Sequence, residues 1–426
     1  MGIVLKNVTL IDSGSELYSV RVDGKLIDKI SKSIEPQTGD EVIDCNGRLL
    51  ISGFYNTHCH SAMTALRGYA DDLELWPWLS EKIFPAEAKL TPEVVYWGSA
   101  VAIAEMLRSG CVSFSDMYFN LDQTAKIVSE SGIKANLSRN IVAGADADYI
   151  NDAQFVETRE LVDGFNGYDD NRIICEATFH AEYTNAPETI AFVADYAKSK
   201  NLGIHFHCSE TQNEHNECIG RHGKTPIALF ESLGALDVRA VAAHCVWVSD
   251  EDMEIMARKK VSVAHNPISN LKLGSGVARL GAMKKAGVNV SLGTDGASSN
   301  NRLDMIRELQ VAALIQKGVN NNPTLLPATE IYKIATKNGA VAQGRFDCGE
   351  IKEGNRADMV LVSTDSPSLN PLYDNYSMLA YAAEASDVCM TMVDGKILYK
   401  DGEYKTLDIE KIRYEASNTL KDFFKK

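Results

Sequence analysis

The chain has 426 residues, 45% of them hydrophobic, and a formal net charge of −15. That length predicts one large domain and a smaller one. The negative charge argues against nucleic acid and anionic membrane as partners, because both bind clustered lysine and arginine. Nine cysteines without a Cys-x-x-Cys pair predict free thiols in a reducing cytoplasm. We expect a cytoplasmic homo-oligomer.

The first fifty residues read as short strands joined by turns. Val20-Arg21-Val22 alternates in polarity and Asp23-Gly24 is a strong hairpin turn. The opening residues lack the layout of a signal peptide. The longest apolar stretch, Val94–Leu107, is interrupted by Glu105 and is too short to span a bilayer.

From Ile51 onward, short β-rich runs alternate with amphipathic helical segments. The predicted strands are Ile51–Thr57, Cys111–Asp116, Ala135–Asn140, Arg172–Thr178, Gly203–His207, Ala240–His244, Val261–His265 and Val288–Thr294. Helical patterns between them include Glu93–Arg108, Pro187–Lys200, Pro226–Leu233 and Asp250–Lys259. This alternation predicts an α/β fold, a (β/α)8 barrel of the TIM type. A doubly wound open sheet is the weaker alternative, because no Gly-x-Gly-x-x-Gly loop follows the first strand.

Short-strand character returns after Arg345, for example in Ala357–Val362 and Gly395–Tyr399. We expect both chain ends to form one small β-sandwich domain (1–52 and 347–407) beside a barrel that spans 53–346. A C-terminal helix, 408–426, is expected to begin at Asp408 as its N-cap and to run to about Phe424.

Several predicted strands end in groups that can bind a metal. His58 and His60 share one face of the first strand, because side chains alternate along a strand. His207 ends the fifth strand, and Asp295 follows the eighth. Active sites of such barrels lie at these carboxyl ends. We therefore predict His58, His60, His207 and Asp295 as ligands of one divalent ion, zinc by default and ferrous iron as the alternative.

Three further groups surround this predicted centre. His205 faces the same way as His207 but lies deeper, so we expect it to pack behind the ligands. Glu210 follows the fifth strand, where a general acid/base would reach a water on the ion. His244 is placed to stabilise developing charge, or is a buried core histidine. The fourth strand carries no lysine to bridge a second ion.

The motifs together resemble a known family. The chain is similar to the amidohydrolase superfamily and, within it, to the 5'-methylthioadenosine/S-adenosylhomocysteine deaminases. The resemblance covers nearly the whole chain and is carried by Asn56–His60, Leu66–Leu73, Trp78-Leu79, Pro85–Glu87, His207–Thr211, His265–Pro267, Gly293–Gly296 and Gly349–Asp358.

The resemblance implies hydrolytic deamination at carbon 6 of adenine in a 5'-substituted adenosine. It implies that Glu210 passes a proton to ring nitrogen N1 and that Asp295 and His244 help to expel ammonia. Four residues are implied for the nucleoside, namely Glu87 for the ribose hydroxyls, Trp78 against the nucleoside, and Arg139 and His180 near the 5' substituent.

The loop after the fourth strand departs from the family pattern. Phe179 and Glu182 flank His180, and a nearby carboxylate would disfavour an anionic 5' tail. The alternatives are a related deaminase or chlorohydrolase acting on a guanine, pterin or triazine ring, and a non-catalytic scaffold, since fold alone does not fix function.

Overall fold

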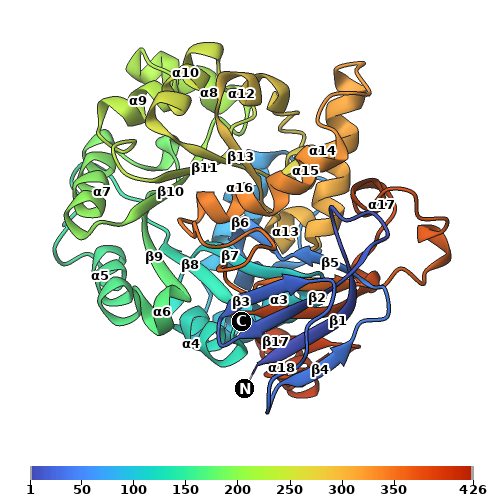
Figure 1. The fold of residues 1–426 in the computed structure, drawn as a ribbon. Helices are drawn as coiled ribbons and strands as arrows, with labels where there is room; N and C mark the ends of the chain where they lie inside the picture. Colours follow the sequence, from blue (N-terminus) through green and yellow to red (C-terminus); the bar gives the residue numbers. More distant parts are fainter. Residues whose placement is uncertain (1, 424–426) are drawn as a thin grey trace.

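The computed structural model describes residues 2–423, and residues 424–426 at the end of the predicted C-terminal helix lie outside that range. Two sheets organise the chain (Figure 1). No helix within the described range is long and apolar enough to cross a membrane. The predicted free thiols are confirmed, because all nine cysteines are buried and none forms a disulfide.

The first sheet is the predicted barrel. Its strands run in parallel and chain order, from β6 to β13, and the two-residue strand β14 pairs with β6 so that the sheet closes on itself. The strands are β6 (Phe54–His60), β7 (Cys111–Tyr118), β8 (Lys134–Arg139), β9 (Ile173–Thr178), β10 (Gly203–Cys208), β11 (Ala240–His244), β12 (Ser262–His265), β13 (Asn289–Leu292) and β14 (Asp295–Gly296).

Helices cover the outside of the barrel, as the amphipathic patterns predict (Figure 1). They are α3 (Pro92–Arg108), α4 (Leu121–Ser131), α5 (Ala153–Phe165), α7 (Pro187–Lys200), α8 (Gln212–His222), α9 (Pro226–Ser232), α10 (Asp250–Lys259), α12 (Leu280–Ala286), α14 (Met305–Val319), α15 (Ala328–Ala335) and α16 (Lys337–Ala342). Capping residues determine where these helices begin and end. Ser249 and Asp252 form a capping box at the start of α10, and Asn201 ends α7 in the left-handed region.

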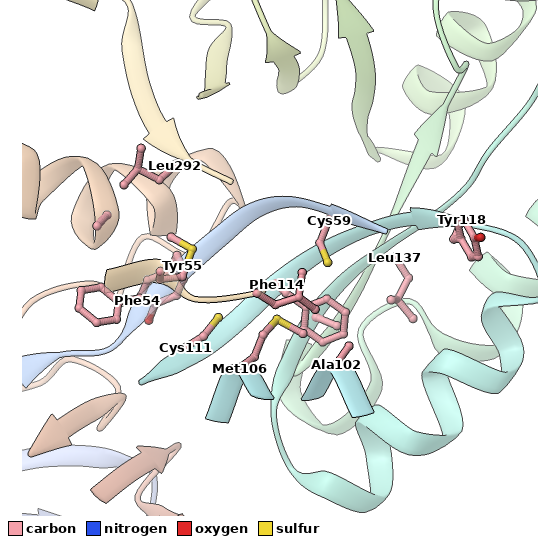
Figure 2. Close-up of a cluster of buried hydrophobic side chains, with 14 of the residues drawn as sticks. Phe54, Tyr55, Cys59, Ala102, Met106, Cys111, Phe114, Tyr118, Leu137 and Leu292 are labelled. Atoms are coloured by element: carbon pink, nitrogen blue, oxygen red, sulfur yellow. The ribbon is translucent and has the colours of Figure 1, made fainter. Parts of the chain in front are cut away.

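The layer between sheet and helices is a continuous apolar core. Figure 2 shows part of it, where Ala102 and Met106 of α3 pack near Phe114 of β7. All of these side chains are fully buried. Burial on this scale fixes the strands, and therefore fixes where their carboxyl ends meet.

The second sheet joins the two chain ends, as predicted, but its strands pair into a single sheet and not into the two separate sheets of a β-sandwich. Blue N-terminal strands lie beside red C-terminal ones in Figure 1. The strands form one continuous mixed sheet, comprising β1 (Ile3–Leu10), β2 (Leu17–Asp23), β3 (Leu26–Ser31), β4 (Glu41–Asp44), β5 (Leu49–Ser52), β15 (Met359–Val362), β16 (Val388–Val393), β17 (Lys396–Lys400) and β18 (Glu403–Tyr404). Helix α17 (Asn375–Tyr381) precedes β16, and α18 (Ile409–Phe423) follows with Asp408 accepting from the backbone N–H of Lys411 at 2.9 Å.

One predicted strand is divided in the structure. Ile51–Thr57 falls partly in β5, which belongs to the small sheet, and partly in β6, which opens the barrel. Gly53 stands at the break, where a Cβ would lie 2.2 Å from the Val112 side chain. The chain therefore passes between the sheets through a position too tight for a larger residue.

Candidate active site

The carboxyl ends of the barrel strands bring four predicted ligands together. His58 and His60 end β6, His207 lies near the end of β10, and Asp295 opens β14. The Oδ1 atom of Asp295 lies 3.5 Å from His58 Nε2 and 3.2 Å from His60 Nε2. His60 Nε2 lies 3.4 Å from His207 Nε2. All four side chains are buried or nearly so.

A metal ion could bind between these imidazoles only through ring nitrogens that carry no proton, so the hydrogen bonds of each ring show whether a metal fits. His60 Nδ1 donates to the Met117 carbonyl at 2.6 Å, and His207 Nδ1 donates to the His180 carbonyl at 2.8 Å. With Nδ1 occupied in this way, Nε2 is the nitrogen that carries the lone pair of each ring when the ring is neutral, and the two Nε2 atoms face one another. Among the described residues, Nε2 of His58 has no hydrogen-bond partner. Converging lone pairs beside a carboxylate suit a divalent cation.

Asp295 is oriented by two serine hydroxyls that the sequence did not single out. Ser269 and Ser299 donate to its Oδ2 at 2.6 and 2.9 Å, which leaves Oδ1 directed at the histidines. Burial alone would raise the pKa of Asp295, but the adjacent imidazoles of His58 and His60 hold that pKa well below its usual range. The side chain is an anion suited to a cation.

His205 lies behind the ligands, as predicted. Its Nε2 lies 3.0 Å from Nδ1 of His58, and its Nδ1 lies 3.9 Å from Glu176. Glu176 is in turn bound by Arg239 at 2.7 Å. The contact with His205 orients the His58 ring, and the ion pair of Glu176 and Arg239 lies behind His205. His265 is also buried, and no group of metal-compatible atoms found among the described residues includes it.

Glu210 and His244 face each other beside the predicted ligands, and the His244 ring lies 5.4 Å from that of His58 and 5.6 Å from that of His207. Glu210 Oε2 lies 3.7 Å from His244 Nε2, and Ser275 donates to Glu210 Oε1 at 3.3 Å. His244 Nδ1 donates to Asn270 Oδ1 at 2.8 Å, which aims Nε2 at the site. Burial raises the pKa of Glu210, opposed by His244. A carboxyl group with a raised pKa is suited to take up and release a proton near neutral pH.

The turn that carries Glu210 is held by a second carboxylate that sequence reasoning missed. Glu214 accepts from the backbone N–H of Ser209 at 2.8 Å and from that of Glu210 at 2.7 Å. Thr211 caps the same helix, α8, with its hydroxyl on the N–H of Glu214. The Thr-x-x-Glu spacing was the available signal, since it marks a helix start whose glutamate turns back toward the chain.

The site opens into a cavity with about 530 Å³ of empty space, including the part open to solvent. Its lining includes most of the predicted substrate-binding residues. They are Trp78, Glu87, His180, Glu210 and Asp295, together with His60, Met63, Leu75, Leu79, Phe84, Tyr118, Phe119, Asn140, Tyr183, His207, His244 and Leu273. Burial raises the pKa of Glu87 to about 7 and lowers that of His180 to about 3. His180 is therefore neutral.

Arg139 is the one predicted substrate residue that the structure does not bring to this cavity. It lines a different cavity, where it pairs with Glu157 and donates to the Asn140 carbonyl.

Phe179 and Glu182, from the loop that departs from the family pattern, also lie outside the active-site cavity. Phe179 is fully buried, stacked on Phe206 at 5.0 Å. Glu182 is buried and bound by Arg221 at 2.7 Å and His222 at 2.9 Å. Its charge is therefore compensated outside the cavity.

Residues 49–398 match the model of the amidohydrolase family. The chain belongs to this family. It is 44% identical over 422 residues to a 5-methylthioadenosine/S-adenosylhomocysteine deaminase from Dictyoglomus thermophilum, covering 99% of this chain and 98% of that one. It is 41% identical over 407 residues, 95% of each chain, to a 5'-deoxyadenosine deaminase from Methanothermobacter thermautotrophicus.

Comparison with solved structures supports the same family assignment. An adenosine deaminase from Xanthomonas campestris, solved with bound zinc, superposes with a TM-score of 0.91 at 31% identity, covering 100% of this chain and 98% of that one. Triazine hydrolases superpose equally well at 21% identity, which shows the shared barrel. The predicted fold class and the enzyme class, a hydrolase of this family, are confirmed by these comparisons.

Proposed function

We propose that this amidohydrolase deaminates the adenine ring of 5'-substituted adenosines to the inosine analogue and ammonia. The candidate substrates are S-adenosylhomocysteine, 5'-methylthioadenosine, 5'-deoxyadenosine and adenosine. One observation carries the proposal. An acid/base pair, Glu210 and His244, lies 3.7 Å apart beside two overlapping groups of metal-compatible atoms, namely His58, His60 and Asp295, and His58, His207 and His244. Glu87 and Trp78 line the cavity beside it, which supports a nucleoside site there. The relatives are named as deaminases of such nucleosides.

His58, His60, His207 and Asp295 would hold the ion, and zinc is our proposal for its identity. When bound, the ion supplies Lewis acidity that makes water nucleophilic near neutral pH. Glu210 takes a proton and delivers it to ring nitrogen N1, which makes carbon 6 more electrophilic. Asp295 accepts the second proton. With its Nδ1–H on Asn270, His244 presents Nε2 as an acceptor to the attacking water, and it donates to the oxygen that develops negative charge once Nε2 has taken up a proton. Asp295 passes its proton to the amino group, the bond between carbon 6 and that nitrogen breaks, ammonia leaves, and carbon 6 keeps the oxygen as a carbonyl.

Glu87 and Trp78 position the nucleoside. A carboxylate is a two-oxygen acceptor matched to the ribose diol. Trp78 is buried and donates Nε1–H to the Ala70 carbonyl at 3.0 Å, so its ring is held in place. A cytoplasmic location and a homo-oligomeric assembly remain predictions from the sequence.

Two measurements test the proposal. Metal analysis of purified protein should find about one divalent ion per chain, as expected for three histidines and a carboxylate. The metal-replete protein should release ammonia and form the inosine chromophore from at least one of the four nucleosides. Guanine and a chlorinated triazine serve as controls. Turnover of a control alone, or of no compound, would contradict adenosine deamination, and protein without metal would support a scaffold.

A further inference from the structure

We infer that a second cavity, between the end of α3 and the start of α14, binds a small anion that carries a diphosphate group. This cavity has about 1220 Å³ of empty space, including the part open to solvent. Among the described residues, none lines both this cavity and the active-site cavity. Its charged lining residues are Arg108, Arg302, Arg307, Glu105, Asp304 and Glu384. The site is therefore separate from the proposed deamination chemistry.

The three arginines of this cavity have no partner. Within the described part of the chain, none of them forms an ion pair or donates a side-chain hydrogen bond. Acids are plentiful in a chain with a net charge of −15. Other arginines use them, and Arg21, Arg221 and Arg356 each bind two or more carboxylates. Three free guanidinium groups in one cavity are thus available to an external anion.

The acids of the same cavity are mostly committed to contacts within the protein. Glu105 is bound by Arg67 at 2.5 Å and accepts a backbone N–H at 3.1 Å. Asp304 caps α14 by accepting two backbone N–H groups of its first turn at 3.1 and 3.2 Å. Glu384 is exposed and accepts from the Ser386 hydroxyl at 3.3 Å. Of these three carboxylates, Glu384 is the one left to repel an incoming anion.

The position of Arg307 is unfavourable for the helix that carries it. Arg307 lies in the first turn of α14, where the helix dipole disfavours a cation. Arg302 lies just before the same helix, two residues ahead of the N-cap Asp304. Helix stability alone does not account for cations at this end. A bound anion would be attracted by both guanidinium groups and by the positive end of the dipole.

The chemistry of the donors indicates phosphate, and their spread indicates more than one phosphate group. A guanidinium group binds two phosphate oxygens through parallel N–H bonds. Arg108 comes from the last turn of α3, whereas Arg302 and Arg307 come from the start of α14. The cavity is also far larger than a single phosphate and is of the size of small-molecule sites. A diphosphate, either free or attached to a nucleoside, can reach cations on both helices.

Calorimetric titration of the metal-replete protein tests the site with three probes at constant ionic strength. They are inorganic pyrophosphate, uridine diphosphate, which lacks the adenine ring of the proposed substrates, and sulfate. We expect a Kd below about 1 mM for a diphosphate, the range that two or three charge-assisted hydrogen bonds supply, and binding of sulfate at least about tenfold weaker. Tighter binding of uridine diphosphate than of pyrophosphate would assign the site to nucleotides, and the reverse order to the free anion. Absence of binding, or sulfate as tight as both diphosphates, overturns the inference.

Substitutions locate the bound anion. Arg302→Gln and Arg307→Gln should each weaken diphosphate binding at least about tenfold, the scale of a charge-assisted contact. Arg413→Gln is the matched control, because Arg413 on α18 is exposed and equally unpaired among the described residues but lies outside this cavity. Glu384→Gln should tighten binding, since it removes a negative charge from the cavity.

The same variants exclude binding at the active-site metal. A diphosphate that bound the metal would be insensitive to Arg302→Gln and Arg307→Gln, and that result overturns the inference. An equal loss in Arg413→Gln also overturns it, because net charge would then decide. Metal content is measured after each titration, so that extraction of the ion by pyrophosphate is not counted as binding.

Discussion

At the scale of single residues, Glu210 is the group on which the chemistry depends most. Its carboxyl is buried, accepts from Ser275, and faces His244 without touching the four ligands through a hydrogen bond. Glu210→Gln keeps the volume and the Ser275 contact but cannot exchange a proton. We expect kcat to fall at least about 10²-fold, the usual scale for loss of an acid/base group. Metal content and thermal unfolding should match the unaltered enzyme, and activity near normal would remove Glu210 from the mechanism.

Glu87 supports a prediction about pH at the same scale. Burial raises its pKa to about 7, so its carboxylate is ionised above that pH and protonated below it. Hydrogen bonds from the ribose diol favour the ionised form. The preference for 5'-deoxyadenosine over 2',5'-dideoxyadenosine should therefore be at least about tenfold at pH 8, the scale of a hydrogen bond to a charged group, and should shrink toward pH 6. The ratio of kcat/KM values cancels the titration of Glu210.

Glu87→Gln is the control for that titration. The amide keeps one acceptor and has no proton to gain, so the preference should become small and independent of pH. A preference that still changes through pH 7 in Glu87→Gln would assign the titration to another group.

At the scale of elements, helix α8 carries the catalytic turn. Glu214 in its first turn accepts both backbone N–H groups of Ser209 and Glu210, and Ser209 has a positive φ of 46° that this clamp supports. Glu214→Ala should release the turn and lower kcat by about 10- to 100-fold, the effect of a shift of about an ångström in a catalytic group. Metal content should be unchanged. Glu217→Ala, an exposed position on the same helix, is the matched control, and equal losses in both variants would reject the clamp.

The sequence predicted the elements that meet at the strand ends better than the parts that approach from turns. His58, His60, His207 and Asp295 follow from periodicity, because parallel strands bring their carboxyl ends to one edge. Ser269 and Glu214 do not, because their positions depend on how short helices leave the strands. Arg139 shows a different gap. The alternation of β8 turns its side chain toward the cavity beside α5 in this structure, and its role near the 5' substituent stays a prediction.

At the scale of the whole molecule, a buried ion-pair cluster joins the barrel to the sheet made from both chain ends. Lys134 of β8 lies 2.5 Å from Asp358, which directly precedes β15. It also lies 2.7 Å from Asp394, which directly follows β16. Tyr55 donates its hydroxyl to Asp358 at 2.8 Å. Both carboxylates are nearly inaccessible to water. The cluster therefore links three segments that are distant in sequence, in a region where water cannot replace a lost partner.

Removing the cation should consequently cost far more than breaking a surface pair. Lys134→Met keeps the length and apolar stem but leaves the buried carboxylate of Asp358 without a cation and that of Asp394 with only Arg356, at 3.5 Å. The free energy of unfolding should therefore fall by about 3–5 kcal/mol. Lys126→Met, which breaks the exposed pair with Asp122 on α4, should cost less than about 0.5 kcal/mol. Denaturant unfolding of the metal-bound forms measures both values. Similar small losses in the two variants would show that the chain ends are held by apolar packing alone, because the buried charges would then have found water or protons without disturbing the contact between the sheets.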